Sequence, residues 1–258
     1  RMHWLYFDRG SPRRLAAAGF TYDSTIGYNE TIGYRAGTTQ PYQPLSVQHL
    51  LELPLHIMDT ALFYPSYLHL TAGEAAGAVA PLIDHASAAG GTVTINWHDR
   101  SLLPERLWDE FYLGLIRRLQ QRGAWFATAA AAVTWFRTRR AASFQTSHLI
   151  TRGRYREALQ LSRAMIDSVY EQNLPRARFH NFHNDLYRAA DRMGLRFTAA
   201  EGARMTAEIA QANGSSDLER LLRAAAAENF SLAGDAGAAE QELRQVEAIR
   251  SPCPAQRR

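Results

Sequence analysis

Apolar and polar positions in the first half of the chain alternate between a spacing typical of strands and one typical of helices. Short apolar or β-branched runs predict strands at residues 3–7, 20–23, 51–58, 92–97 and 124–128. Segments with helical spacing lie between them, at residues 11–18, 71–89, 104–122 and 129–140. Because strand and helix alternate in this order, residues 1–142 are expected to form parallel strands with covering helices, in an α/β sheet or barrel.

Strand signals are absent from residues 143–258. The pattern there predicts five helices, at residues 154–172, 175–193, 199–212, 216–233 and 236–250. Two stretches resemble parts of a tetratricopeptide unit. The residues that carry this resemblance are Leu149, Gly153, Tyr155, Ala158 and Leu159, and later Ala227, Phe230, Gly234, Asp235, Ala238, Ala239 and Leu243. We therefore expect an all-α, tetratricopeptide-like segment that offers a surface to a protein partner.

Between Asp23 and Pro65 the pattern loosens, and Gly, Pro, Tyr and Thr become frequent. Long loops inside a domain are usually functional. Two interpretations stay open for this one. It could form a surface for a sugar or another polar ligand, or it could be an ordered loop packed by its own aromatic side chains.

Composition narrows the classes of partner. The chain has 258 residues, of which 46% are hydrophobic, so it can bury a real core. Its net charge of +4 is small and scattered, which does not favour nucleic-acid binding. No apolar run is long enough to span a bilayer. The single cysteine, Cys253, excludes an intrachain disulfide and leaves the compartment undetermined. Because the chain starts at Arg1, close to an apolar segment, we interpret it as a fragment.

His98 stands where the predicted strand at 92–97 ends, and Asp99 follows it. A catalytic group is often found at such a point, because the strand holds it rigid and the loop admits substrate. The alternative is a structural histidine that caps the strand.

Several segments of the first half resemble, in order and spacing, the polysaccharide deacetylase (NodB-homology, carbohydrate esterase) family. The stretch 90–99 is similar to a late strand that ends in Leu-x-His, with Asn96 where Leu is usual. Residues 123–128 are similar to the closing strand of that family. Residues 1–5 stand where an Arg-x-Pro-x-Gly motif is found, with His3 for Pro and Leu5 for Gly. Residues 15–25, 33–38 and 53–59 resemble a bacterial subgroup of the family.

The resemblance implies a fold, a reaction and roles for particular residues. The fold is a partial (β/α) barrel, and the reaction is metal-assisted removal of acetyl groups from a glycan. His98 would be the catalytic acid, Arg1 would orient the catalytic base, and Asp23 would support Arg1. Residues expected in the substrate pocket, by position only, are Arg35, Asp59 and Trp97.

The sequence departs from this family where the metal should bind. The Thr-Phe-Asp-Asp and His-x-x-x-His motifs are absent, so a divalent metal, zinc by expectation, would have its ligands outside this chain. His180 and His183 are three residues apart with Asp185 nearby, a spacing that can bind metal. No third ligand is evident in the sequence, which favours helix packing over metal binding.

Two hypotheses of different classes follow. The first is an acetyl-glycan hydrolase, with little or no hydrolysis by this chain alone. The second is a non-catalytic carbohydrate-binding or protein-interaction scaffold that uses the helical segment. A helical segment joined by a frame artefact is a further alternative.

Overall fold

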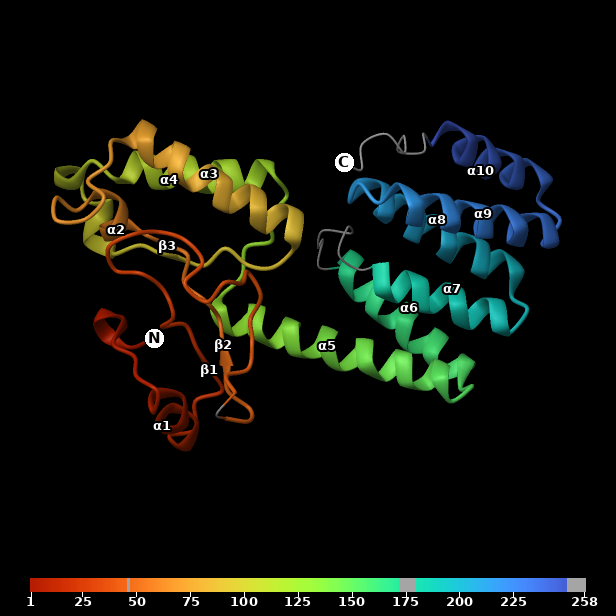
Figure 1. Cartoon of the computed structure of the whole chain (residues 1–258), viewed down its shortest axis with the longest axis horizontal. Helices are drawn as coiled ribbons and strands as arrows, with labels where there is room; N and C mark the ends of the chain where they lie inside the picture. The colour runs from red at the N-terminus through yellow and green to blue at the C-terminus, as the bar shows by residue number, and fades with distance from the viewer. Residues whose placement is uncertain (46, 172–179, 250–258) are drawn as a thin grey trace, which may run out of the picture. The chain divides into compact units, whose positions relative to one another are not determined.

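The computed structural model describes residues 1–45, 47–171 and 180–249 (Figure 1). The chain forms two compact units, Arg1–Phe136 and Arg137–Arg258. The boundary falls inside α5 (Ala129–Thr151), which continues past residue 140, where the sequence predicted its end. The boundary between the two units lies six residues before the expected boundary at 142. Within the described residues, no helix combines the length and apolar character needed to cross a bilayer.

Helices form most of the regular structure of the first unit. Before α5 they are η1 (His3–Leu5), α1 (Ser11–Ala17), α2 (Asp59–Phe63), α3 (Ala72–Ala89), η2 (Asp99–Leu102), η3 (Pro104–Arg106) and α4 (Asp109–Gln121). The start of α3 is fixed by a capping box, in which the Thr71 hydroxyl accepts from the Glu74 backbone N–H and the Glu74 carboxylate accepts from that of Thr71.

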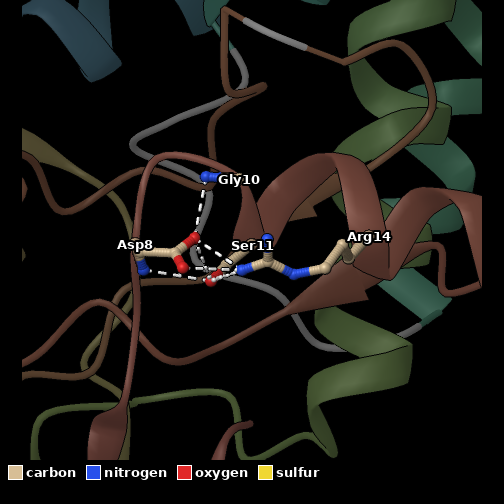
Figure 2. Close-up of polar contacts among 4 residues, drawn as sticks. All are labelled: Asp8, Gly10, Ser11 and Arg14. Carbon is tan, nitrogen blue, oxygen red and sulfur yellow. Dashed lines mark hydrogen bonds and ion pairs between the residues drawn. The ribbon is translucent and has the colours of Figure 1, made fainter.

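The start of α1 is organised by a carboxylate that precedes it. Figure 2 shows Asp8 accepting hydrogen bonds from the Gly10 backbone N–H (2.8 Å) and the Ser11 hydroxyl (3.1 Å). Arg14, one turn into the helix, donates to both oxygens of Asp8 at 2.6 and 2.7 Å. The helix begins at Ser11, as the sequence predicted, and Gly10 is its N-cap residue.

The α/β prediction for the first unit is wrong. Its described strands are two residues long each, in two separate parallel pairs, so no barrel forms. They are β1 (Tyr22–Asp23) with β2 (Leu51–Glu52), and β3 (Ile57–Met58) with β4 (Ile95–Asn96). The described part of the chain is mainly helical.

Local chemistry explains why the predicted strands are short or missing. In the segment 3–7, Trp4 and Leu5 have φ values of 60° and 52°, so it makes a 3-10 turn instead of extended backbone. Pro54 lacks a backbone N–H and stands between β2 and β3, where the predicted strand 51–58 divides. No strand is assigned to residues 124–128.

The apolar runs nevertheless supply the core of this unit. Ile57, Leu62 and Val79 are almost completely buried and pack in one cluster with Leu115 and Leu119. This cluster joins β3, α2, α3 and α4. Because β3 and β4 are parallel, with Met58 opposite Asn96, the residues that follow both strands leave the core at the same edge.

The second unit is a series of helices, each packed on the next. They are α6 (Tyr155–Glu171), α7 (His180–Arg192), α8 (Arg196–Ala212), α9 (Ser216–Leu232) and α10 (Ala236–Ala248). Small residues let them approach closely: a Cβ added to Gly202 of α8 would lie 2.9 Å from the Leu186 side chain of α7. Where they are described, these helices follow the predicted ranges to within three residues; the predicted start at 175 and the predicted ends at 172 and 250 lie outside the described residues. The tetratricopeptide resemblance stays a prediction.

A buried ion cluster joins α9 to α10. The Arg223 guanidinium donates from Nε to Glu219 Oε1 (2.8 Å) and from Nη1 to Glu242 Oε2 (2.9 Å). All three side chains are at most 7% exposed. Buried charges of this kind require their partners, because water cannot solvate them once a partner is lost.

Candidate acid–base site

Asp59 and His98 lie side by side at the common edge of β3 and β4. Asp59 is fully buried as the first residue of α2. Its Oδ1 lies 2.7 Å from His98 Nδ1, and its Oδ2 accepts the backbone N–H of His98 at 2.9 Å. Oδ1 also accepts the Thr60 N–H at 2.8 Å. Both carboxylate oxygens are therefore used to hold His98 and the start of α2.

This arrangement fixes the protonation geometry of the imidazole. A carboxylate oxygen only accepts, so Nδ1 of His98 carries a hydrogen and Nε2 is the nitrogen that takes up and releases a proton. The His98 side chain is 41% exposed, so solvent or a ligand can reach the imidazole. A histidine backed by a buried carboxylate can act as a general acid or base.

A second histidine, His56, holds the backbone just before β4 in place. His56, 2% exposed, accepts the backbone N–H of Thr94 at its Nδ1 (3.0 Å). Burial lowers the pKa of His56 to about 4, so this ring stays neutral and keeps the acceptor lone pair that Thr94 needs.

Trp97 belongs to an aromatic cluster beside the dyad. Its ring stacks on Phe111, with centroids 6.0 Å apart, and contacts Phe63 and Tyr112. Its Nε1 is buried and has no hydrogen-bond partner among the described residues. The cluster stabilises the end of β4, which in turn fixes the position of His98.

Arg1 and Asp23, the other two expected catalytic residues, lie together at a different place. The Arg1 backbone nitrogen is 3.3 Å from Asp23 Oδ1, and Arg1 Nε donates to the Ser24 carbonyl at 2.9 Å. Asp23 is 2% exposed and also accepts from the Thr25 hydroxyl. None of the contacts of the described residues joins this pair to His98 directly.

Arg35 contacts the loop that contains it. Its Nη1 donates to the Gly27 carbonyl at 2.7 Å, and its guanidinium lies 5.8 Å from the ring centroid of Tyr28. The structure thus brings Asp59 and His98 together, brings Arg1 and Asp23 together, and holds Arg35 within its own loop.

Sequence reasoning missed Glu52, a buried carboxylate opposite Asp23. The two residues are register partners on β2 and β1, and Glu52 is 1% exposed. Its Oε1 accepts the Ile26 N–H at 2.7 Å. Burial, together with the nearby charge of Asp23, raises the pKa of Glu52 to about 7. The only sequence signal was a charged residue inside the apolar run 50–53.

Glu52 predicts a pH dependence of stability. Its pKa is higher in the folded than in the unfolded chain, so its stabilising contribution is complete below about pH 4.5 and is lost as the pH rises to about 7. The difference is worth roughly 3 kcal/mol. Glu52→Gln keeps the acceptor for Ile26 and should abolish this decline, which urea unfolding at a series of pH values measures. The exposed Glu105→Gln is the control, and an equal decline in wild type and Glu52→Gln would contradict the assignment.

The described residues do not fit the divalent metal that the resemblance implies. No group of three or more His, Cys, Asp or Glu side chains that could hold an ion occurs in the part of the chain that the structure describes. His183 and Asp185 are buried in α7, where the Thr146 hydroxyl donates to Asp185 at 2.6 Å.

Comparison with known proteins does not assign the chain to a family. No family model, curated protein or solved structure matches the chain.

Proposed function

We propose that the protein hydrolyses acetyl groups from a glycan, with His98 as general acid. The observation that carries this proposal is the dyad, in which both oxygens of buried Asp59 hold His98 while Nε2 keeps its proton-transfer capacity. The acetylated glycan as substrate class rests on the resemblance of residues 1–140 to polysaccharide deacetylases. The proposal does not include the (β/α) barrel of that family, because the described strands of the first unit form only two short pairs.

In the proposed step, His98 acts as an imidazolium. Water gives up a proton to the base as its oxygen adds to the acetyl carbon, and the bond from that carbon to the sugar nitrogen or oxygen breaks. The proton on Nε2 passes to the departing atom, so the products are acetate and the free amine or hydroxyl. Asp59 stabilises the imidazolium before transfer and keeps the ring aligned, and the neutral ring then takes a proton from water. As the resemblance implies, Arg1, supported by Asp23, would orient the base that activates water. Arg35 and Trp97, which pack within their own loop and aromatic cluster, take no part in this step.

Acetate release tests this proposal directly. The protein at its natural length is incubated with N-acetylated and O-acetylated oligosaccharides, with zinc, cobalt or magnesium supplied, and free acetate is measured. His98→Ala should lose acetate release, because the acid is removed. His148→Ala, at an exposed histidine of α5, is the matched control. Equal release by wild type and His98→Ala would show that His98 is not the acid.

A non-catalytic carbohydrate-binding or protein-interaction scaffold is the second candidate. It is favoured by the lack of a metal-binding group among the described residues and by the stacked helices of the second unit. Binding of a glycan or peptide without any acetate release would support it over hydrolysis.

A further inference from the structure

A cavity of about 290 Å³ lies in the second unit, where α5 ends, α6 begins and α7 makes its last two turns. One water molecule takes up about 30 Å³ in the liquid, so this space holds about ten waters or one small ring-shaped ligand. Its walls are formed by three charged residues of α7 together with Ile150, Thr151, Tyr155 and Tyr187. The chemistry of these walls decides which ligand fits.

The charges around the cavity cancel, so it does not select an ion. The charged lining residues, their ion partners and the carboxylate that acts on Tyr187 are Arg188, Arg192 and Arg196 against Asp185, Asp191 and Glu228. Arg188 pairs with Asp185 at 3.8 Å, and Arg196 pairs with Asp191 at 2.6 Å. A ligand with a net charge would therefore meet no excess of the opposite sign.

The lining is also too polar for an aliphatic side chain or a lipid tail. Among the described residues that line the cavity, Ile150 alone is aliphatic, and its core neighbours already cover most of it. Thr151 donates its hydroxyl hydrogen to the Ser147 carbonyl at 2.9 Å, which leaves its oxygen free to accept. An apolar ligand would cover such groups without offering them a hydrogen bond.

Two tyrosine rings give the cavity flat apolar faces, each with a hydroxyl at its tip. Tyr155 and Tyr187 pack against the core cluster that contains Leu149 and Ala189, which holds both rings in place. Burial, with nearby carboxylates adding to it, raises the pKa of Tyr187, so its hydroxyl keeps its proton and can donate. A ligand that covers these rings and uses these hydroxyls needs an apolar face and polar edges.

We propose that this cavity binds one uncharged sugar ring of a glycan. A pyranose ring combines C–H groups on its face with edge hydroxyls that both donate and accept, and it carries no charge. The C–H face packs on the rings of Tyr155 and Tyr187. The sugar hydroxyls accept from Arg192 and donate to Thr151. This site lies in the helical unit, goes beyond the proposed hydrolysis and does not depend on the acid–base dyad.

Isothermal titration calorimetry of the full chain with cellohexaose and with N-acetylated chitohexaose tests the proposal. At least one of these uncharged oligosaccharides should bind with a dissociation constant below about 1 mM. Tyr155→Leu removes a ring and should raise that constant about tenfold. Tyr187→Phe keeps the ring, removes only the hydroxyl and should raise it about fivefold. Because no ion pair forms with the sugar, a rise from about 50 to about 500 mM NaCl should change it less than about twofold.

Tyr170→Leu is the matched control, because Tyr170 is exposed at the opposite end of the helix that Tyr155 begins. It should leave the dissociation constant within about twofold of wild type. Equal weakening by Tyr155→Leu and Tyr170→Leu, or unchanged binding in both Tyr155→Leu and Tyr187→Phe, would overturn the proposal.

Three further results would also contradict it: no binding of either oligosaccharide, a loss of about tenfold in affinity at high salt, and equally tight binding of adenine. The salt result would identify a charged ligand, and the adenine result would identify a flat aromatic one. Calorimetry detects binding whether or not acetate is released, so failure of this site and failure of the dyad are separate results.

Discussion

Asp59→Asn is expected to lower the rate of acetate release by about two to four orders of magnitude. Asp59 accepts three hydrogen bonds in the structure, from Thr60 N, His98 N and His98 Nδ1. Asparagine offers one acceptor oxygen, and its amide group donates. If the amide donates to Nδ1, the proton of the neutral imidazole moves to Nε2, and the stabilisation of the imidazolium is lost.

Nitrogen NMR of the His98 ring gives a readout that a merely structural defect would not produce. Wild type should show the Nδ1–H form of the neutral ring, and Asp59→Asn should show the Nε2–H form. The matched control is Asp99→Asn, at the exposed neighbour, whose carboxylate accepts the Arg100 backbone N–H. Its activity should stay near that of wild type. Wild-type activity in a folded Asp59→Asn protein would contradict the role given to the dyad.

The sequence predicted those features of the site that depend on neighbouring residues, and missed those that depend on contacts between distant segments. His98 was found because it ends an apolar run, which is a local pattern. Its partner Asp59 was expected in the pocket by position only, since contact between them depends on the parallel pairing of β3 and β4. Glu52 was missed for a related reason: its burial against Asp23 arises from strand register across the chain and leaves almost no local trace.

The fold shows the same limit. Helices follow from local spacing and caps, and α3 begins at the capping box that Thr71 and Glu74 make possible. The run 51–58 was expected to be a strand; it is buried, but burial of a run does not require a long ladder of strand hydrogen bonds. Pro54 and the left-handed backbone at Trp4 and Leu5 interrupt the runs, so alternation of strand and helix signals overestimated the sheet.

Arg223→Met is expected to lower the free energy of unfolding of the second unit by about 3–5 kcal/mol. The substitution keeps most of the side-chain volume but leaves Glu219 and Glu242 buried, with 6% exposure each, without their shared cation. Urea unfolding followed by circular dichroism measures the change. Arg244→Met, at an exposed pair with Glu240, is the control and should change stability little.

A triple variant separates the charge effect from a packing defect. Replacing Arg223 by Met and both glutamates by Leu removes every charge of the cluster, so no buried carboxylate remains without a partner. Buried ion clusters exchanged for well-packed apolar side chains are often equal or higher in stability. The triple variant should therefore recover most of the stability lost in Arg223→Met. If it is as unstable as the single variant, the loss comes from packing between α9 and α10 and not from stranded charge.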